Sequence, residues 1–207
     1  MRRIALALLL PASMAFAAGP LSIGIKGGVP FNDAFHTATS GNVSYVTQNK
    51  FWTLGPELDV NLPFGLGIEV DALYRRLNFE STGPVTDLIA HAATTANAWD
   101  FPVLAKWKFA PGPIRPYVVA GPTFRNVSSV KQVVDFFGAQ PSSKTDSPAE
   151  LRDRFTTGFT LGGGLQLLGH ISPEIRYTRW GWSNFRDTSG LLKTNPDQVE
   201  FLVGLTF

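Results

Sequence analysis

The feature that most constrains this chain is a two-residue alternation of apolar and polar positions that recurs along most of its length. The final segment, VEFLVGLTF, has five apolar residues on one side: Val199, Phe201, Val203, Leu205 and Phe207. Seven earlier segments repeat the pattern: LSIGIKG from position 21, LGPELDVNL from 54, LGIEVDALYR from 66, WDFPVLAKWKF from 99, RPYVVAGPTFR from 115, FTLGGGLQL from 159 and ISPEIRYT from 171. Such alternation indicates a strand whose two faces meet different surroundings. The sequence therefore predicts an all-β fold with eight antiparallel strands.

The connections between these segments alternate strictly in length. The short ones are residues 63–65, 110–114 and 168–170, and the long, polar ones cover approximately residues 29–50, 80–98, 127–154 and 181–198. An up-and-down barrel of the outer membrane has this arrangement, with short periplasmic turns and long extracellular loops. We therefore expect an eight-stranded transmembrane β-barrel with both termini in the periplasm.

One face of the predicted strands carries acidic and basic residues at similar depths. An eight-stranded barrel has an interior that its own side chains about fill, and an unpaired charge there would be strongly destabilising. We therefore expect a paired ion network inside the barrel. Its expected members are Glu57, Asp59, Glu69, Asp71, Arg75, Asp100, Lys106, Arg115, Arg125, Glu174, Arg176 and Glu200, and Lys26 and Lys108 share the same face.

The opposite face carries almost no charge and has aromatic residues near the strand ends. Trp52, Trp99 and Phe159 lie toward the long connections, and Trp107 and Phe207 lie toward the short turns. Two aromatic bands about an apolar belt are typical of a wall that faces lipid. The alternative is a soluble, lipocalin-like barrel with its apolar face inward. That alternative explains neither the order of loop lengths nor the charge-free aromatic face.

The N-terminus has the pattern of a bacterial secretory signal peptide. Arg2 and Arg3 precede an apolar run, and AFA at positions 15–17 matches a cleavage site. We therefore expect residues 1–17 to be a signal peptide, cleaved after Ala17, and residues 18–207 to be one barrel domain. The remaining basic residues then equal the 16 acidic ones, which gives no argument for a nucleic-acid partner. The absence of cysteine excludes disulfides and thiolate metal sites.

Several of these segments resemble a known family. The chain resembles the outer membrane protein β-barrel domain family, small eight-stranded barrels similar in architecture to the OmpA transmembrane domain and OmpX. The resemblance rests on LGPELDVNLPFGLGIEVDALYRR, DFPVLAKWKF, RPYVVAGPTF, PEIRYTRW and VEFLVGLTF. The terminal segment is similar to the β-signal that the outer-membrane assembly machinery reads, which implies an assembly role for Phe201, Val203, Leu205 and Phe207. The resemblance implies a location in the bacterial outer membrane and fixes no substrate.

Few residues suggest catalysis or metal binding. His170 and Ser172 form an H-x-S pair, which resembles the Ser and His of barrel-wall lipid A deacylases. The predicted position of this pair is a periplasmic turn, whereas such a site should face the outer leaflet. His36 and His91 lie in different long connections, where we expect solvated side chains rather than metal ligands. The paired carboxylates of the polar face fit a structural network better than acid–base chemistry.

We therefore expect a non-enzymatic integral outer-membrane protein, with no catalytic residue, metal site or cofactor. Its role would be structural, with surface contacts through four long extracellular loops. Its expected partners are outer-membrane lipids and lipopolysaccharide, the assembly machinery, and a surface ligand bound by the loops; we expect a monomer. Two alternatives stay open at this stage: a narrow passive pore for small solutes, and a barrel-wall lipid-modifying enzyme such as a lipid A deacylase.

Overall fold

The computed structural model describes residues 20–32, 38–40, 43–47, 52–85, 88–136, 143–145, 153–184 and 195–207. The predicted signal peptide and its cleavage site lie outside these ranges. Within them the chain forms strands and turns, and its one helical turn is a short 3-10 segment, Pro63–Gly65. No helix among these residues is long and apolar enough to cross a membrane.

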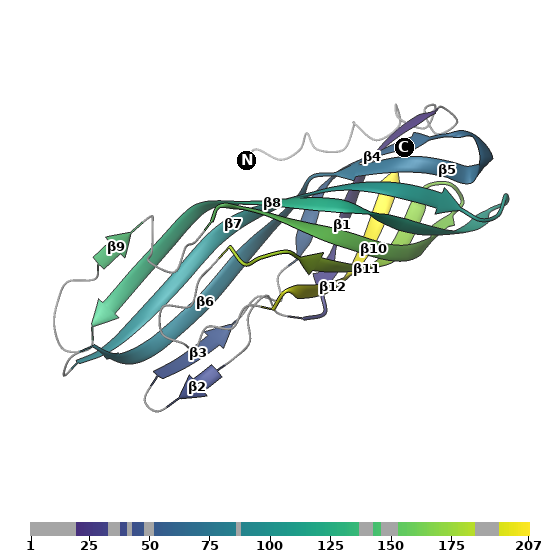
Figure 1. The fold of residues 1–207 in the computed structure, drawn as a ribbon. Coiled ribbons are helices and arrows are strands. Elements are labelled where there is room, and N and C mark those ends of the chain that lie inside the picture. The colour runs from purple at the N-terminus through teal and green to yellow at the C-terminus, as the bar shows by residue number, and fades with distance from the viewer. Residues whose placement is uncertain are drawn as a thin grey trace, which may run out of the picture.

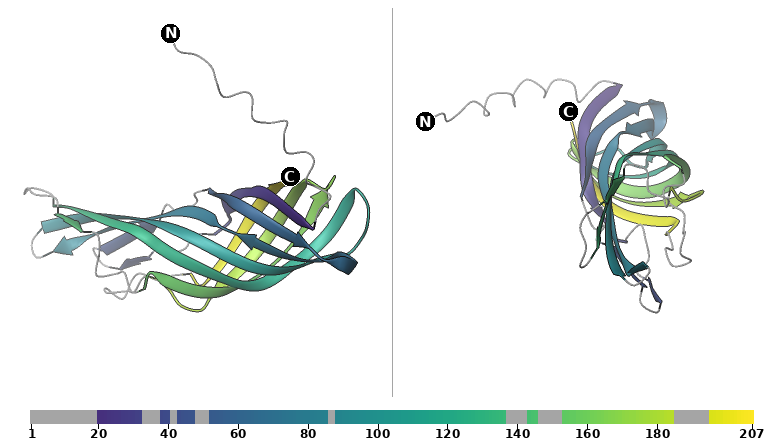
Figure 2. Two further views of the ribbon diagram at one scale, coloured as in Figure 1. Left: turned by 90° about the horizontal axis from the view of Figure 1, so that it is seen from above. Right: turned by 90° about the vertical axis from the view of Figure 1, so that its left-hand side faces the viewer.

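Eight wall strands close into an antiparallel barrel, as the sequence predicts (Figure 1). Each strand pairs with the next, and the last pairs with the first, since Gly24 lies opposite Thr206. The ring is visible when the molecule is seen from one end (Figure 2, right). Around the ring the strands are β1 (Leu21–Pro30), β4 (Thr53–Asn61), β5 (Leu66–Asp71) continued by β6 (Leu73–Val85), β7 (Leu88–Lys108), β8 (Ile114–Phe136), β10 (Phe155–Leu167), β11 (Ile171–Trp180) and β12 (Asp197–Thr206).

Strands β5 and β6 are two halves of one wall strand, interrupted at Ala72. The neighbouring strand β4 has Pro56 at this level, and proline has no N–H to donate to a ladder. The Ala72 N–H donates to the Pro56 carbonyl oxygen at 3.0 Å, so one hydrogen bond bridges the break. The wall therefore stays closed where the regular pairing stops.

Three wall strands run far beyond the barrel at the end opposite the short turns, which we call the loop end. β7 has 21 residues and β8 has 23, whereas a membrane crossing needs about 9–11. β6, β7 and β8 form a projecting sheet (Figure 2, left), and three short strands, β2 (Ala38–Ser40), β3 (Val43–Thr47) and β9 (Ser143–Thr145), lie along its sides.

The projecting sheet corrects two expected loop boundaries. Most of residues 80–98 and residues 127–136 are strand rather than irregular loop. The alternating pattern fades there because a strand in water needs no apolar face, while backbone pairing with its neighbour continues. β8 contains one β-bulge, opposite residues 95–97 of β7. Ser129 lies in this bulge and has a φ of 50°.

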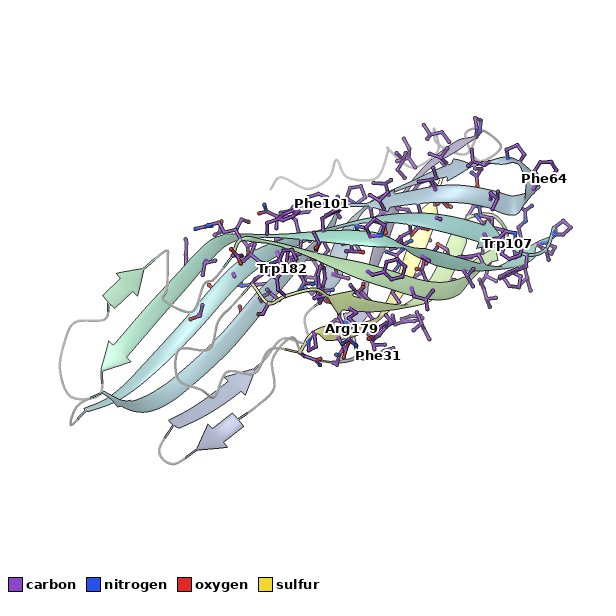
Figure 3. The ribbon with its side chains drawn as sticks, viewed as in Figure 1. Phe31, Phe64, Phe101, Trp107, Arg179 and Trp182 are labelled. Atoms are coloured by element: carbon purple, nitrogen blue, oxygen red, sulfur yellow. The ribbon has the colours of Figure 1, made fainter. Side chains whose placement is uncertain are left out.

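The side-chain alternation gives the barrel a charged interior and an apolar exterior. Along β11 the pattern is strict: Ser172, Glu174, Arg176, Thr178 and Trp180 are buried. Large apolar side chains cover the outside, and those labelled in Figure 3 include Phe64 and Trp107 at the turn end and Phe101 and Trp182 farther along. This distribution is the reverse of that of a water-soluble barrel.

Candidate functional site

The barrel interior contains two ion clusters. The turn-side cluster lies nearer the short turns and consists of Lys26, Glu57, Asp59, Glu69, Asp71, Lys106, Glu174 and Arg176. The loop-side cluster consists of Arg75, Asp100, Arg125, Gln198 and Glu200. All these residues are buried, although they come from many different strands. They share one location because each occupies an inward position of its strand.

Lys26 lies at the centre of the turn-side cluster and is fully buried. Its Nζ atom lies 2.5 Å from Glu69 Oε1, 3.1 Å from Glu57 Oε1 and 3.3 Å from Glu174 Oε2. These carboxylates come from β5, β4 and β11, so one ammonium group joins three other strands to β1. Charge-assisted contacts of this kind offset the cost of removing the ammonium from water.

Arg176 and Glu69 connect the rest of the turn-side cluster. The Arg176 guanidinium donates hydrogen bonds to Glu69 and Glu174, and to Asp71 Oδ2 at 2.6 Å. Glu69 also accepts from Lys106 Nζ at 2.6 Å, and it therefore contacts three cations. Both side chains are at most 1% exposed, so the removal of either would leave unpaired buried charges.

The turn-side cluster contains five carboxylates and three cations, which is a formal excess of two negative charges. Glu57 has the weakest set of partners: neither of its carboxylate oxygens accepts a hydrogen bond from the described residues, although Lys26 lies 3.1 Å away. Oxygens of Glu57, Glu69 and Asp71 lie within 4.8 Å of one another, a spacing that could hold a hard cation. The Lys26 ammonium already contacts all three residues and supplies that positive charge.

The loop-side cluster is balanced and more regular. Arg125 forms a two-point contact with Asp100 at 2.6 and 2.8 Å and donates to Gln198 Oε1 at 2.8 Å. Its guanidinium carbon also lies 3.9 Å from the centre of the Trp180 ring, a cation–π contact. Arg75 lies 2.6 Å from Glu200 and 3.2 Å from Asp100. β6, β7, β8 and β12 are thus joined by one network.

Inward-facing glycines make room for the largest interior side chains. A Cβ at Gly164 would lie 2.7 Å from the phenol oxygen of Tyr117, and one at Gly162 would lie 3.0 Å from Cγ of Arg176. Tyr117 uses this space to donate a hydrogen bond to Glu174 Oε2 at 2.9 Å. The GGG run at residues 162–164 therefore accommodates bulky partners inside the barrel rather than binding a phosphate.

The structure buries eleven of the twelve expected network residues and places one elsewhere. Arg115 is exposed, and its Nε donates to the Gly112 carbonyl oxygen at 2.8 Å in the adjacent turn. The expectation for Arg115 is therefore wrong. Arg115 occupies one of the alternate positions of β8 that face inward, but it lies beyond the end of the filled interior. Lys26 was not among the twelve expected network residues, and neither were Tyr117 and Gln198, although all three contact the network in the structure. All three lie at inward-facing positions of their strands, so the same two-residue alternation that identified the other network residues could have found them.

The H-x-S pair is not assembled as a catalytic dyad. His170 is exposed in the turn before β11, and its Nδ1 lies 3.0 Å from the Thr206 carbonyl oxygen. Ser172 is 3% exposed and faces the interior, where its hydroxyl has no hydrogen-bond partner among the described residues. His36 lies outside the described residues, and His91 lies on the projecting part of β7.

The family follows from comparison with known proteins. Residues 4–207 match the profile of the family described as "Outer membrane protein beta-barrel domain". The chain belongs to this family. The match covers the whole barrel, and it agrees with the closed eight-stranded wall and its apolar exterior. The protein is therefore a bacterial outer-membrane barrel, in which short turns face the periplasm and the loop end faces the cell exterior.

Solved barrels of low sequence identity are similar to this chain. Neisserial surface protein A shares 11% identity, covering 91% of this chain and 98% of its own, with a TM-score of 0.44. OprG from Pseudomonas aeruginosa shares 11% identity, and the match covers 90% of this chain and 94% of OprG, with a TM-score of 0.43. Ail, the attachment invasion locus protein of Yersinia pestis, shares 12% identity, and the match covers 91% of this chain and 100% of Ail, also with a TM-score of 0.43. A search among curated protein sequences finds no match.

Proposed function

We propose that this outer-membrane barrel is a non-enzymatic structural protein, a monomer that makes surface contacts through its four extracellular connections. The observation that carries the proposal is the filled interior. The charged side chains of both ion clusters are at most 7% exposed, and they join strands across the lumen. A lumen occupied in this way supports a stable wall rather than an aqueous channel.

Buried apolar residues strengthen this argument at the extracellular end of the loop-side cluster. Level with Arg75 and beyond it, they occupy inward positions of three neighbouring strands: Leu77, Ala96, Ala98, Val127 and Val130. Each is at most 5% exposed. Ions and small polar solutes cross apolar, water-free regions poorly, so this layer supports a closed lumen.

The projecting sheet supports a role in surface contact. β6, β7 and β8 continue well past the length that the membrane requires and reach into the space outside the cell. Paired strands hold a surface in place better than long irregular loops, and binding residues commonly lie on segments that a rigid scaffold positions. We propose lipopolysaccharide and a further surface ligand as partners of this end.

Conductance measurements test the closed lumen. The purified barrel, reconstituted in planar bilayers, should give no stable single-channel steps. A variant with Arg176→Ala and Glu69→Ala, which removes two interior residues that each contact three oppositely charged partners, should leak more often than the wild type. Regular single-channel steps from the wild-type protein would favour the passive pore instead.

Cell experiments test the surface role separately. A strain that lacks the protein would be complemented either with the full chain or with a form in which a short turn replaces the upper part of the β6–β7 hairpin. Both forms should restore resistance to detergent, whereas only the full chain should restore attachment to surfaces. Equal attachment by both strains would contradict a role for the projecting sheet.

The lipid A deacylase has weaker support. Its serine would have to reach lipid, whereas Ser172 faces the interior and the His170 ring contacts a backbone carbonyl. Mass spectrometry of lipopolysaccharide should show the same acyl chains with the wild type and with Ser172→Ala. An acyl loss that disappears in Ser172→Ala would establish the enzyme and overturn this part of the proposal.

A further inference from the structure

A cavity of about 350 Å³ lies at the periplasmic rim, between the 3-10 turn at residues 63–65 and the β7–β8 turn. Phe64, Phe109 and Pro111 give it apolar walls, and Lys108 and Arg115 bring two cations into its lining. We call it the rim cavity. It lies at the opposite end of the barrel from the projecting sheet, so its ligand is independent of the proposed surface role.

The two cations of the rim cavity have only neutral partners among the described residues. Lys108 Nζ donates to the amide oxygen of Asn61 at 2.6 Å, and Arg115 Nε donates to the carbonyl oxygen of Gly112. The three turns at this end, residues 62–66, 109–114 and 168–170, contain no Asp or Glu. The rim cavity therefore presents positive charge that no carboxylate of these turns neutralises, and it suits an anion.

The apolar side of the rim cavity is unusually open. Of its lining residues, Phe64 is 93% exposed and Phe109 is 50% exposed. Trp107 lies just outside the lining, with its ring centre 4.7 Å from that of Phe109, and it is also 50% exposed. Figure 3 shows Phe64 and Trp107 together at this end of the barrel. Phe64 also has a φ of 65°, in the left-handed region that disfavours bulky side chains and usually holds glycine or asparagine. An aromatic side chain held outward at such a position is suited to contact with lipid.

We propose that the rim cavity binds an anionic phospholipid of the periplasmic leaflet. Lys108 and Arg115 would contact the phosphate, and Phe64, Trp107 and Phe109 would contact the glycerol backbone and the start of the acyl chains. Charge complementarity favours an anionic over a zwitterionic lipid, because the ammonium of a zwitterionic headgroup would lie beside two cations. The exposed aromatics favour a lipid over free phosphate, which has no apolar part to contact them.

Native mass spectrometry of the detergent-solubilised barrel tests this site. The protein would be mixed with equal amounts of phosphatidylglycerol and phosphatidylcholine that carry the same acyl chains. The wild type should retain phosphatidylglycerol in about tenfold excess, because the choline ammonium of phosphatidylcholine would lie beside the two cations of the cavity. The double variant Lys108→Gln/Arg115→Gln should retain both lipids equally, whereas Arg154→Gln, an exposed arginine at the other end, should behave as the wild type.

Two further experiments distinguish a phospholipid headgroup from free phosphate as the ligand. Inorganic phosphate at the same concentration as the lipid should not displace phosphatidylglycerol. Phe64→Asn, which suits the turn but removes the aromatic ring, should reduce retention of phosphatidylglycerol and leave binding of soluble glycerophosphate unchanged. Displacement by inorganic phosphate, no lipid preference in the wild type, or an unchanged preference in the double variant would each overturn the proposal. Heat-modified gel mobility would verify that every variant is folded.

Discussion

Arg176→Leu should strongly destabilise the barrel. The guanidinium donates to carboxylates on β5 and β11, and its side chain is 1% exposed. Leucine would remove one of three cations from a cluster that already has two more carboxylates than cations. The formal charge of the turn-side cluster would change from two to three negative, in a place that water does not reach.

The expected size of this effect follows from the burial of Arg176. Removal of one partner from a buried ion pair typically costs about 3–5 kcal/mol. Arg176 contacts three carboxylates, so we expect a loss at or above the upper end of that range. The equilibrium constant for unfolding would then rise roughly several-thousand-fold, since each 1.4 kcal/mol corresponds to about tenfold.

The same strand offers a matched control. Arg179 lies three positions later on β11, its side chain is 69% exposed, and its nearest carboxylate is 3.8 Å away at Asp197. Arg179→Leu makes the same chemical change and should alter the stability by less than about 1 kcal/mol. Both free energies would be measured by reversible urea unfolding in lipid vesicles, followed by tryptophan fluorescence and gel mobility. Equal losses for the two variants would refute the view that the interior network stabilises the barrel.

Other predictions concern two carboxylates of the turn-side cluster, the interior glycines and the C-terminus. Glu57→Gln should change the free energy of unfolding by less than about 1 kcal/mol in the urea assay, because it removes a surplus carboxylate, whereas Glu69→Gln should destabilise by about 3 kcal/mol or more. Gly164→Val should prevent refolding judged by gel mobility, since its Cβ would lie 2.5 Å from a backbone carbonyl, while outward-facing Gly163→Val should refold normally. Deletion of Phe207 should reduce membrane insertion in cells, measured by fractionation, more than refolding in detergent; normal insertion would contradict an assembly role for this residue.

The face of each strand could be predicted from the sequence, because period two divides the residues of a strand into two sets whatever the partner strand is. Glu69 and Glu174 are far apart in the sequence, yet the two-residue alternation of their own strands is enough to assign both to the interior. Their individual partners could not be predicted. Pairing depends on how far each strand is displaced relative to its neighbour, and the sequence pattern carries no measure of that displacement.

The point along each strand at which the filled interior ends could not be predicted from the sequence either. Arg115 and Tyr117 have the same parity on β8, but Tyr117 is buried and Arg115 lies at the rim. The projecting sheet was missed for a related reason. A strand that continues beyond the membrane needs no lipid-facing apolar side, so the alternation that marks a membrane strand fades while the pairing of β7 with β6 and β8 continues.

The placement of Lys26 has a consequence for how such a chain enters the membrane. Its partners Glu69 and Glu174 stand 43 and 148 positions away in the sequence, on strands from opposite halves of the chain. A strand that crossed the lipid alone would carry its charge without a counter-ion, and half a barrel would leave much of the turn-side cluster unmatched. The low-energy route is therefore one in which the two ends of the chain meet before the hydrocarbon core is crossed. Insertion and closure become a single event, and a barrel cut into halves should enter a bilayer only when both halves are present.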